Sequence, residues 1–305
     1  MKKEVFVPLY VSNICHSSCR ICNLRKENKK VIRIQGGKEK LEEQLEILYK
    51  RENVREICFL TGELKQGEQR TENFEYIMYA INQAFQHGFQ RIFFNIGSLM
   101  DEEIDKIYER YPHDNRIVLS LFQETYDKTI YQKVFGSYEQ DNPKSNFDRR
   151  LTTPERWIKK GFLNVDIGIL LGINPDTEQD IEKLIKHANY LYSLGAEVYL
   201  SLPRIYQFGK MTRLITDDKY IEYVRWLKRA CPWARVIITT RESVTTIKKA
   251  LPYIDVVSPG CSDIMPYTWE GEIINDERTS QFKVADKRSR PSEIIHELQI
   301  KMEVK

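Results

Sequence analysis

The sequence predicts an α/β fold, a closed (β/α)8 barrel of the TIM type. Along the 305 residues, eight short apolar segments alternate with amphipathic segments. Strands that alternate with helices in this way form a parallel sheet. Eight such units suit a closed barrel better than an open sheet, and such a barrel typically uses about 250 residues. We therefore expect residues 1–305 to form one barrel domain.

The same alternation assigns most of the chain. We expect strands at residues 5–11, 56–61, 91–96, 116–122, 164–171, 197–202, 235–239 and 254–258. We expect helices at residues 38–51, 72–86, 101–111, 177–194, 218–230 and about 291–300. A further helix should begin at about residue 153, and a short one should end at residue 250. The segment after the last strand is polar, so we expect an irregular tail and a final helix at about 259–305.

The composition excludes several classes of partner. The 47 basic and 44 acidic residues leave a net charge of only +3, so we expect no nucleic-acid partner. The mean hydropathy is −0.51, and no apolar run approaches the roughly 18 residues that cross a membrane. The first residues lack the apolar core of a signal peptide. We therefore expect a cytoplasmic protein whose cysteines are reduced.

Three of the six cysteines lie together directly after the first apolar segment. Cys15, Cys19 and Cys22 have the spacing C-x3-C-x2-C. Three thiolates cannot fill the four iron corners of a [4Fe–4S] cluster, so one iron would stay open for a small ligand. A disulfide with a spare thiol fits a reducing compartment poorly. A zinc site would need a fourth ligand, and His16 is too close to Cys15 to supply it. The spacing therefore favours a cluster.

Polar side chains follow the predicted strands at the end where barrel enzymes hold their active sites. These residues are Glu63, Gln123, Glu124, Arg150, Arg204, Arg241 and Cys261. All of them would surround the same mouth of the barrel as the cysteine loop. Because separate signals converge on one end of the barrel, we expect the active site there.

The cysteine spacing and the strand before it resemble the radical S-adenosylmethionine (SAM) enzymes. Further matching segments occur in family order at residues 8–13, 61–63, 123–126, 143–153, 167–172, 201–204, 240–243 and 286–295. They resemble the aromatic amino-acid lyase branch of that class. This branch includes the tyrosine lyase of thiazole biosynthesis (2-iminoacetate synthase) and the tyrosine lyase maturase of [FeFe]-hydrogenase. The resemblance covers nearly the whole chain and implies the barrel of the radical SAM class.

The resemblance implies two cofactors, a [4Fe–4S] cluster and SAM. Cys15, Cys19 and Cys22 would ligate the cluster. Glu63 would hold the SAM amino group, and Glu124 would lie near the SAM ribose. The remaining cofactor-binding candidates are Arg150 and Arg204 near the SAM carboxylate, Ile21 against the adenine, and Tyr10.

The resemblance also implies the reaction. Reductive cleavage of SAM would give a 5′-deoxyadenosyl radical, which acts on an aromatic amino acid such as tyrosine and leads to cleavage of its Cα–Cβ bond. Arg241 matches the arginine that grips the substrate carboxylate, although a structural pair with the adjacent Glu242 is the alternative. Cys261 is the second candidate catalytic residue. A low-potential electron donor such as flavodoxin or ferredoxin would be the partner.

Some positions depart from the family pattern and leave the substrate open. Ile21 replaces the usual aromatic residue before the third cysteine, and Asn23 replaces the glycine after it. Residues 261–267 replace a Gly-Gly-Tyr motif that helps line the cavity.

Two other functions stay open at this point. One is a sulfur-inserting radical SAM enzyme, similar to lipoyl or biotin synthase. It would need a second cluster, for which only Cys58, Cys231 and Cys261 remain. The other is a non-catalytic iron–sulfur assembly or electron-transfer protein, which would not need the SAM-type residues.

Overall fold

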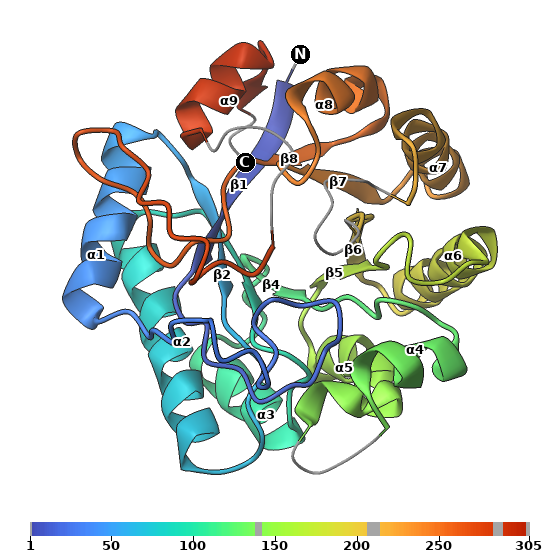
Figure 1. Cartoon of the computed structure of the whole chain (residues 1–305), viewed down its shortest axis with the longest axis horizontal. Coiled ribbons are helices and arrows are strands. Elements are labelled where there is room, and N and C mark those ends of the chain that lie inside the picture. The colour runs from blue at the N-terminus through green and yellow to red at the C-terminus, as the bar shows by residue number, and fades with distance from the viewer. Residues whose placement is uncertain (1, 138–141, 206–213, 283–288, 303–305) are drawn as a thin grey trace.

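The computed structural model, which describes residues 2–137, 142–205, 214–282 and 289–302, contains the predicted closed barrel. Parallel strands surround the centre, and helices cover the outside of the ring (Figure 1). The ring strands are β1 (Lys2–Tyr10), β2 (Glu56–Leu60), β3 (Arg91–Asn95), β4 (Ile117–Ser120), β5 (Asn164–Gly168), β6 (Glu197–Ser201), β7 (Arg235–Thr239) and β8 (Val256–Ser258). The prediction of a (β/α)8 barrel is confirmed.

Strand β1 closes the ring by pairing with a strand on each side. Phe6 pairs with Glu56 of β2, and Glu4 pairs with Val256 of β8, both in parallel register. A short strand, β9 (Lys301–Met302), also pairs with the start of β1. All eight carboxyl ends therefore meet at one mouth, as in other barrels of this type.

The helices follow their strands in the expected order. They are α1 (Lys38–Glu46), α2 (Glu68–His87), α3 (Asp101–Arg110), α4 (Lys128–Phe135), α5 (Phe147–Lys160), α6 (Thr177–Ser193), α7 (Asp217–Ala230), α8 (Val244–Ala250) and α9 (Pro291–Glu297). A π-helical turn (Ile47–Arg51) continues α1, so the segment expected as helix 38–51 is helical throughout. Short 3-10 turns occur at Pro143–Ser145 and Leu251–Tyr253.

One predicted helix begins earlier than expected. The helix expected from about 153 begins at Phe147, because the Asn146 side chain caps it by accepting a hydrogen bond from the Arg149 amide (3.0 Å). Proline is common in the first turn of a helix, but Pro154 lies inside α5. Helix α4 lies in a segment for which the sequence predicted no element. Its start is capped by Asp127, which accepts a hydrogen bond from the Ile130 amide (2.9 Å).

The buried apolar residues form an outer layer between strands and helices and an inner layer inside the ring. The inner layer consists of Phe6, Cys58, Phe93, Val118, Tyr199, Ile237 and Val256. Because these side chains fill the middle of the barrel, a ligand can enter only from an end. None of the helices in the described part of the chain is long and apolar enough to cross a membrane.

Candidate active site

A cavity of about 470 Å³ opens at the carboxyl ends of the strands and continues into the barrel. It brings together all eleven residues predicted for the site. They are Tyr10, Cys15, Cys19, Ile21, Cys22, Glu63, Glu124, Arg150, Arg204, Arg241 and Cys261. Residues more than 200 positions apart in the sequence thus share one space. Gln123, expected at the mouth, is buried but does not line the cavity.

The cysteine loop lies directly against the end of β2. A Cβ atom at Gly62 would overlap the backbone of Ile14 and the side chain of Cys15, so only glycine permits this approach. The Cys15 thiol contacts the Glu63 carbonyl oxygen (Sγ–O 3.7 Å) and accepts a hydrogen bond from the Ser17 amide (3.4 Å). The Thr-Gly-Glu sequence therefore positions the cysteine loop as well as the Glu63 carboxylate.

Burial disfavours the charged form of the thiols in the cysteine loop. Burial raises the pKa of Cys15, and the neighbouring Cys22 raises it further. Burial also raises the pKa of Cys19, although the nearby Lys144 ammonium opposes this effect. Buried thiolates need a compensating positive charge, which the irons of a cluster would supply.

All three cysteines of the loop line the cavity. Among the described residues, no three His, Cys, Asp or Glu side chains are placed to hold a single metal ion. A cluster differs from a zinc site in this respect, because each cysteine binds a separate iron. Three cysteines match a cluster with one open iron, whereas a structural zinc site needs four ligands.

The C-terminal segment after β8 holds the cysteine loop from the other side. Asn23, which departs from the family pattern, donates a hydrogen bond to the Ser280 carbonyl oxygen (2.8 Å). The Asn23 amide also donates to the Gln281 carbonyl oxygen (3.3 Å). Tyr10 donates through its hydroxyl to the Gln281 side chain (2.5 Å), whose amide nitrogen lies 3.9 Å from the Cys22 sulfur. Asn23 thus connects the cysteine loop to the C-terminal segment around Ser280 and Gln281.

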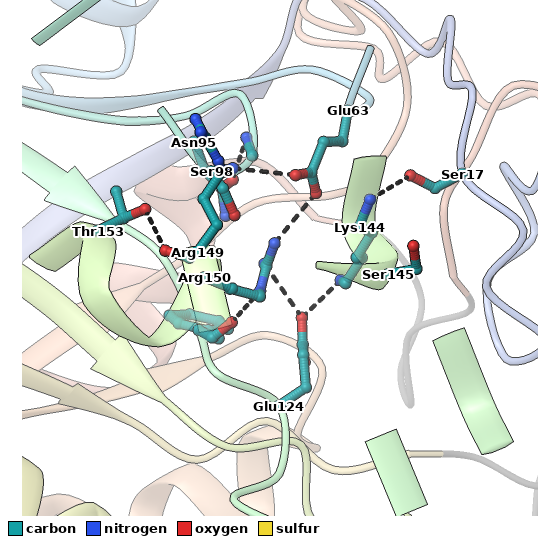
Figure 2. Close-up of polar contacts among 12 residues, drawn as sticks. Ser17, Glu63, Asn95, Ser98, Glu124, Lys144, Ser145, Arg149, Arg150 and Thr153 are labelled. Carbon is teal, nitrogen blue, oxygen red and sulfur yellow. Dashed lines mark hydrogen bonds and ion pairs between the residues drawn. The ribbon is translucent and has the colours of Figure 1, made fainter. Parts of the chain in front are cut away.

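Four charged residues that line the cavity form a network with one another (Figure 2). Arg150 donates from Nη1 to the Glu63 carboxylate (3.0 Å), and its Nη2 lies 3.6 Å from Glu124. Lys144 donates to the same Glu124 oxygen (2.7 Å). Arg150 also donates from Nε to the Phe122 carbonyl oxygen (2.5 Å). The two carboxylates and two cations therefore compensate one another, with Glu63, Glu124 and Arg150 buried and Lys144 partly exposed.

The network keeps Glu124 ionised. Burial raises the pKa of Glu124, but Lys144 and Arg150 outweigh burial and hold this pKa below its ordinary value. Burial lowers the pKa of Lys144, and Glu124 overcomes that effect, so the pKa of Lys144 is raised. Glu124 also has a left-handed backbone conformation (φ 71°), which is uncommon for a residue other than glycine and is frequent at functional sites.

Glu63 has a second support from the loop that follows strand β3. Its carboxylate accepts a hydrogen bond from the Ser98 amide (3.0 Å). A Cβ atom at Gly97, where φ is 90°, would overlap the Glu63 side chain. Glycine is thus required at position 97 both by the backbone conformation and by the close approach of Glu63.

The two arginines after β6 and β7 have different surroundings. Arg204 is fully buried and donates to both carboxylate oxygens of Glu242, to Asp217 (2.8 Å) and to the Ile215 carbonyl oxygen (2.8 Å). Glu242 is therefore the partner of Arg204. The guanidinium of Arg241 lies over the Phe282 ring, 3.6 Å from its centre. Burial lowers the pKa of Arg241, while Tyr10 and Glu124 oppose this change.

The comparison with known protein families agrees with this geometry. The model of the radical SAM superfamily matches residues 9–188, which is more than half of the chain. The matched region includes the three cysteines and the charged network. The chain belongs to the radical SAM superfamily. Its cofactors are accordingly a [4Fe–4S] cluster and SAM.

Two relatives agree with the branch that the sequence resembles. The 2-iminoacetate synthase of Salmonella typhimurium is 23% identical over 247 residues, covering 78% of this chain and 60% of that enzyme. This chain therefore spans about three fifths of that relative. The FeFe-hydrogenase maturase HydG from Carboxydothermus hydrogenoformans has a similar structure (TM-score 0.82, 24% identity, 98% of this chain and 66% of that chain). The predicted resemblance to this branch is confirmed.

A further solved structure shares the fold at lower identity. Methylornithine synthase (PylB) aligns with a TM-score of 0.72 and 17% identity, over 98% of this chain and 82% of that one. At such identity the likeness shows the fold alone.

The residues of the cavity fit both radical SAM cofactors. Three thiols are the donor set that a [4Fe–4S] cluster with one open iron requires. SAM carries an ammonium group, a carboxylate and ribose hydroxyls, and the cavity presents buried carboxylates and guanidinium groups to such a ligand. The existing hydrogen bonds of Arg204 occupy all three of its nitrogens. Its role toward SAM stays a prediction.

The residues that sequence reasoning missed come from loops and from the barrel interior. Lys144 completes the charged network, and Gln281 connects Tyr10 to the cysteine loop. Asp166 lines the cavity from inside β5. The signal for Asp166 was a charged residue in the middle of an apolar strand. Nothing local distinguishes Lys144 from the many surface lysines.

The cysteines required for a second cluster do not gather. Cys58 and Cys261 both line the cavity. Cys231 ends α7 ahead of β7, at the opposite end of the barrel from the mouth, and does not line the cavity. The described residues therefore do not provide three cysteines for an additional cluster near the site.

Proposed function

We propose that this protein is a radical SAM lyase that cleaves an aromatic amino acid such as tyrosine between Cα and Cβ. The observation that carries the proposal is the single cavity in which three thiols, a paired carboxylate network and Arg241 meet. The resemblance to 2-iminoacetate synthase supports the same reaction class. A low-potential electron donor such as flavodoxin or ferredoxin is proposed as the partner.

The cofactors supply one part of the chemistry and the chain supplies the rest. Reductive cleavage of SAM at the cluster provides the radical that takes hydrogen from the substrate amine, after which the Cα–Cβ bond would break into a p-cresol-type fragment and dehydroglycine. The chain would hold the cluster through Cys15, Cys19 and Cys22. Glu63 and Glu124 would orient SAM through its ammonium and ribose groups. The buried walls would keep water away from the reacting atoms.

Arg241 would hold the carboxylate of the substrate. A guanidinium fork binds a carboxylate through two parallel hydrogen bonds, and it is well suited to stack on an aromatic ring as Arg241 does on Phe282. The structural alternative was a pair with Glu242, but Glu242 accepts hydrogen bonds from two nitrogens of Arg204. The proposal therefore assigns Arg241 to the substrate carboxylate.

The experiment compares two arginines of the same strand region. In Arg241→Lys the charge stays and the planar fork is lost. This variant should bind SAM and carry the cluster, but tyrosine-stimulated release of 5′-deoxyadenosine should fall by roughly 10–100-fold. Arg235→Lys at the start of β7, outside the cavity, is the control and should keep the stimulation. Full stimulation by tyrosine in Arg241→Lys would remove the carboxylate-binding role.

Two measurements separate this proposal from the other functions. Iron analysis should find about four irons per chain, whereas a sulfur-inserting enzyme with a second cluster would hold clearly more. Reductive SAM cleavage by the reconstituted protein would exclude a passive iron–sulfur carrier. Testing the common amino acids for stimulation of this cleavage would identify the substrate. If none of them stimulates it, the lyase proposal fails.

A further inference from the structure

A carboxyl group that the proposed reaction does not use lies inside the barrel, below the mouth. Asp166 in β5 is 2% exposed and lines the cavity together with Ser120 of β4 and Ser201 of β6. The Ser120 hydroxyl donates to Oδ2 of Asp166 (2.7 Å), and the Ser201 hydroxyl donates to Oδ1 (2.9 Å). Three adjacent strands therefore orient one carboxyl group in the wall of the cavity.

The surroundings of Asp166 differ from those of the other carboxylates near the cavity. Glu63 is paired with Arg150, and Glu124 is paired with Lys144. In the part of the chain that the structure describes, no ion pair involves Asp166, and its two side-chain partners are neutral hydroxyls. Burial raises its pKa to about 7, even though both hydroxyls act to lower that pKa.

The carboxyl group retains capacity for another hydrogen bond. An ionised carboxylate offers about four acceptor positions, and the two serine hydroxyls fill about two of them. A buried charge without a compensating donor is costly. A ligand that brings a donor to Asp166 would therefore gain binding energy, and a ligand without one would leave this cost uncompensated.

Asp166 lies deeper in the cavity than Arg241. Asp166 is within strand β5, whereas Arg241 follows the end of β7. Apolar side chains from neighbouring strands, including Leu60 and Ile237, also line the cavity. An amino acid whose carboxylate meets Arg241 could therefore extend an apolar side chain inward and place its far end near Asp166.

We propose that Asp166, oriented by Ser120 and Ser201, determines substrate specificity by accepting a hydrogen bond from the far end of the substrate side chain. The inference rests on the proposed amino-acid lyase function. For tyrosine the donor is the phenol hydroxyl. The ammonium group of a basic amino acid has the same donor chemistry, so the experiment must distinguish these two sources.

The experiment measures ligand discrimination by the cluster-loaded enzyme with SAM bound. Calorimetry gives the affinities for tyrosine, phenylalanine, lysine and norleucine, so that each donor-bearing amino acid is compared with one that lacks the donor. Wild-type protein should bind tyrosine at least about tenfold more tightly than phenylalanine. Asp166→Ala should bring that ratio close to one. Asp166→Asn, which keeps the volume, should lower the ratio because an amide is a weaker acceptor than a carboxylate.

Control measurements separate recognition from stability. Ser258→Ala removes another hydroxyl from the cavity wall and should change both affinities together, which leaves their ratio unchanged. Thermal unfolding and iron content establish that the Asp166 variants are folded and loaded. SAM affinity should stay the same in all of them.

The possible outcomes distinguish the role of Asp166, the aromatic substrate and the lyase function. An unchanged tyrosine-to-phenylalanine ratio in both Asp166 variants would overturn the inference and leave Asp166 as a structural link between strands, while the lyase proposal would stand. A preference for lysine over norleucine that Asp166→Ala removes would support the role of Asp166 and overturn the aromatic substrate. Failure of every amino acid to bind the wild-type protein would overturn the proposed function, and the inference with it.

Discussion

The barrel contains two buried groups of charged residues, one at its floor and one at its mouth. At the floor, Glu4 accepts hydrogen bonds from Arg91 (2.9 Å), from the Tyr199 hydroxyl (2.8 Å) and from Arg235. Glu56 lies beside Glu4, and burial together with this neighbour raises the pKa of Glu56 to about 9. None of these five residues lines the cavity.

The mouth has a similar group of paired charges, but these residues line the cavity. Glu63, Glu124, Lys144 and Arg150 pair with one another as closely as the floor residues do. All four also line the cavity and lie beside the cysteine loop. The comparison shows that burial, pairing and shifted pKa values do not identify a site by themselves. Access to a cavity with additional chemistry distinguishes the mouth from the floor.

The largest expected effect comes from the thiols at the mouth. Replacing Cys15, Cys19 or Cys22 by Ala should abolish the iron–sulfur absorbance and all SAM cleavage, because each thiolate binds a separate iron. Cys231→Ala is the control, since this buried cysteine lies outside the cavity, and it should keep the cluster. Iron content and release of 5′-deoxyadenosine are the measurements. SAM cleavage that survives in any one of the three variants would refute the ligand assignment.

The second largest effect should occur at the floor and concern stability alone. Glu4→Gln removes the charge that compensates Arg91 and Arg235, so the free energy of unfolding should fall by about 3–5 kcal/mol. Urea unfolding measures this change, and calorimetry should find the SAM affinity unaltered. A parallel loss of SAM affinity would contradict the independence of floor and mouth.

At the mouth the matching substitution should affect the ligand more than the fold. Glu63→Gln keeps the shape that Gly97 accommodates but removes the charge for the SAM ammonium, so binding should weaken by about 1.5–3 kcal/mol. Glu103→Gln provides the control, because Glu103 forms an ion pair with Arg70 (2.7 Å) away from the cavity. Equal SAM affinity in the wild type and Glu63→Gln would count against the assignment.

For a change of a single pH unit, the smallest expected effect is a pH dependence of stability that belongs to the floor. The pKa of Glu56 is about 9 in the folded protein and 4.5 as its ordinary value, so the native state keeps a proton that the unfolded state loses. Its contribution to stability therefore falls as the pH rises from about 4.5 to about 9, by up to about 1.4 kcal/mol per pH unit. Glu56→Gln preserves the neutral form and should flatten this slope in unfolding experiments. An equally steep slope in the variant would assign it to other groups.

The sequence by itself determined the fold class and most of the elements. Apolar runs with strand composition and amphipathic segments with helical period are local signals, so eight strands and their order could be read without knowledge of any contact. The boundaries of β7 agree with the prediction, while α5 begins six residues early because Asn146 caps it. The rule that barrel sites lie at the carboxyl ends of strands then placed the predicted residues at one mouth.

Only the tertiary structure decided how these side chains pair. Sequence adjacency suggested Arg241 with Glu242, but Glu242 binds Arg204, which is 38 residues away. Asn23 was unexplained until its contact with Ser280 was known. Asp166 reaches its serine partners across neighbouring strands, 46 and 35 residues away in sequence. The physical reason is that a local pattern sets the direction of a side chain, whereas its partner depends on strand register and loop packing, which are defined only when the barrel closes.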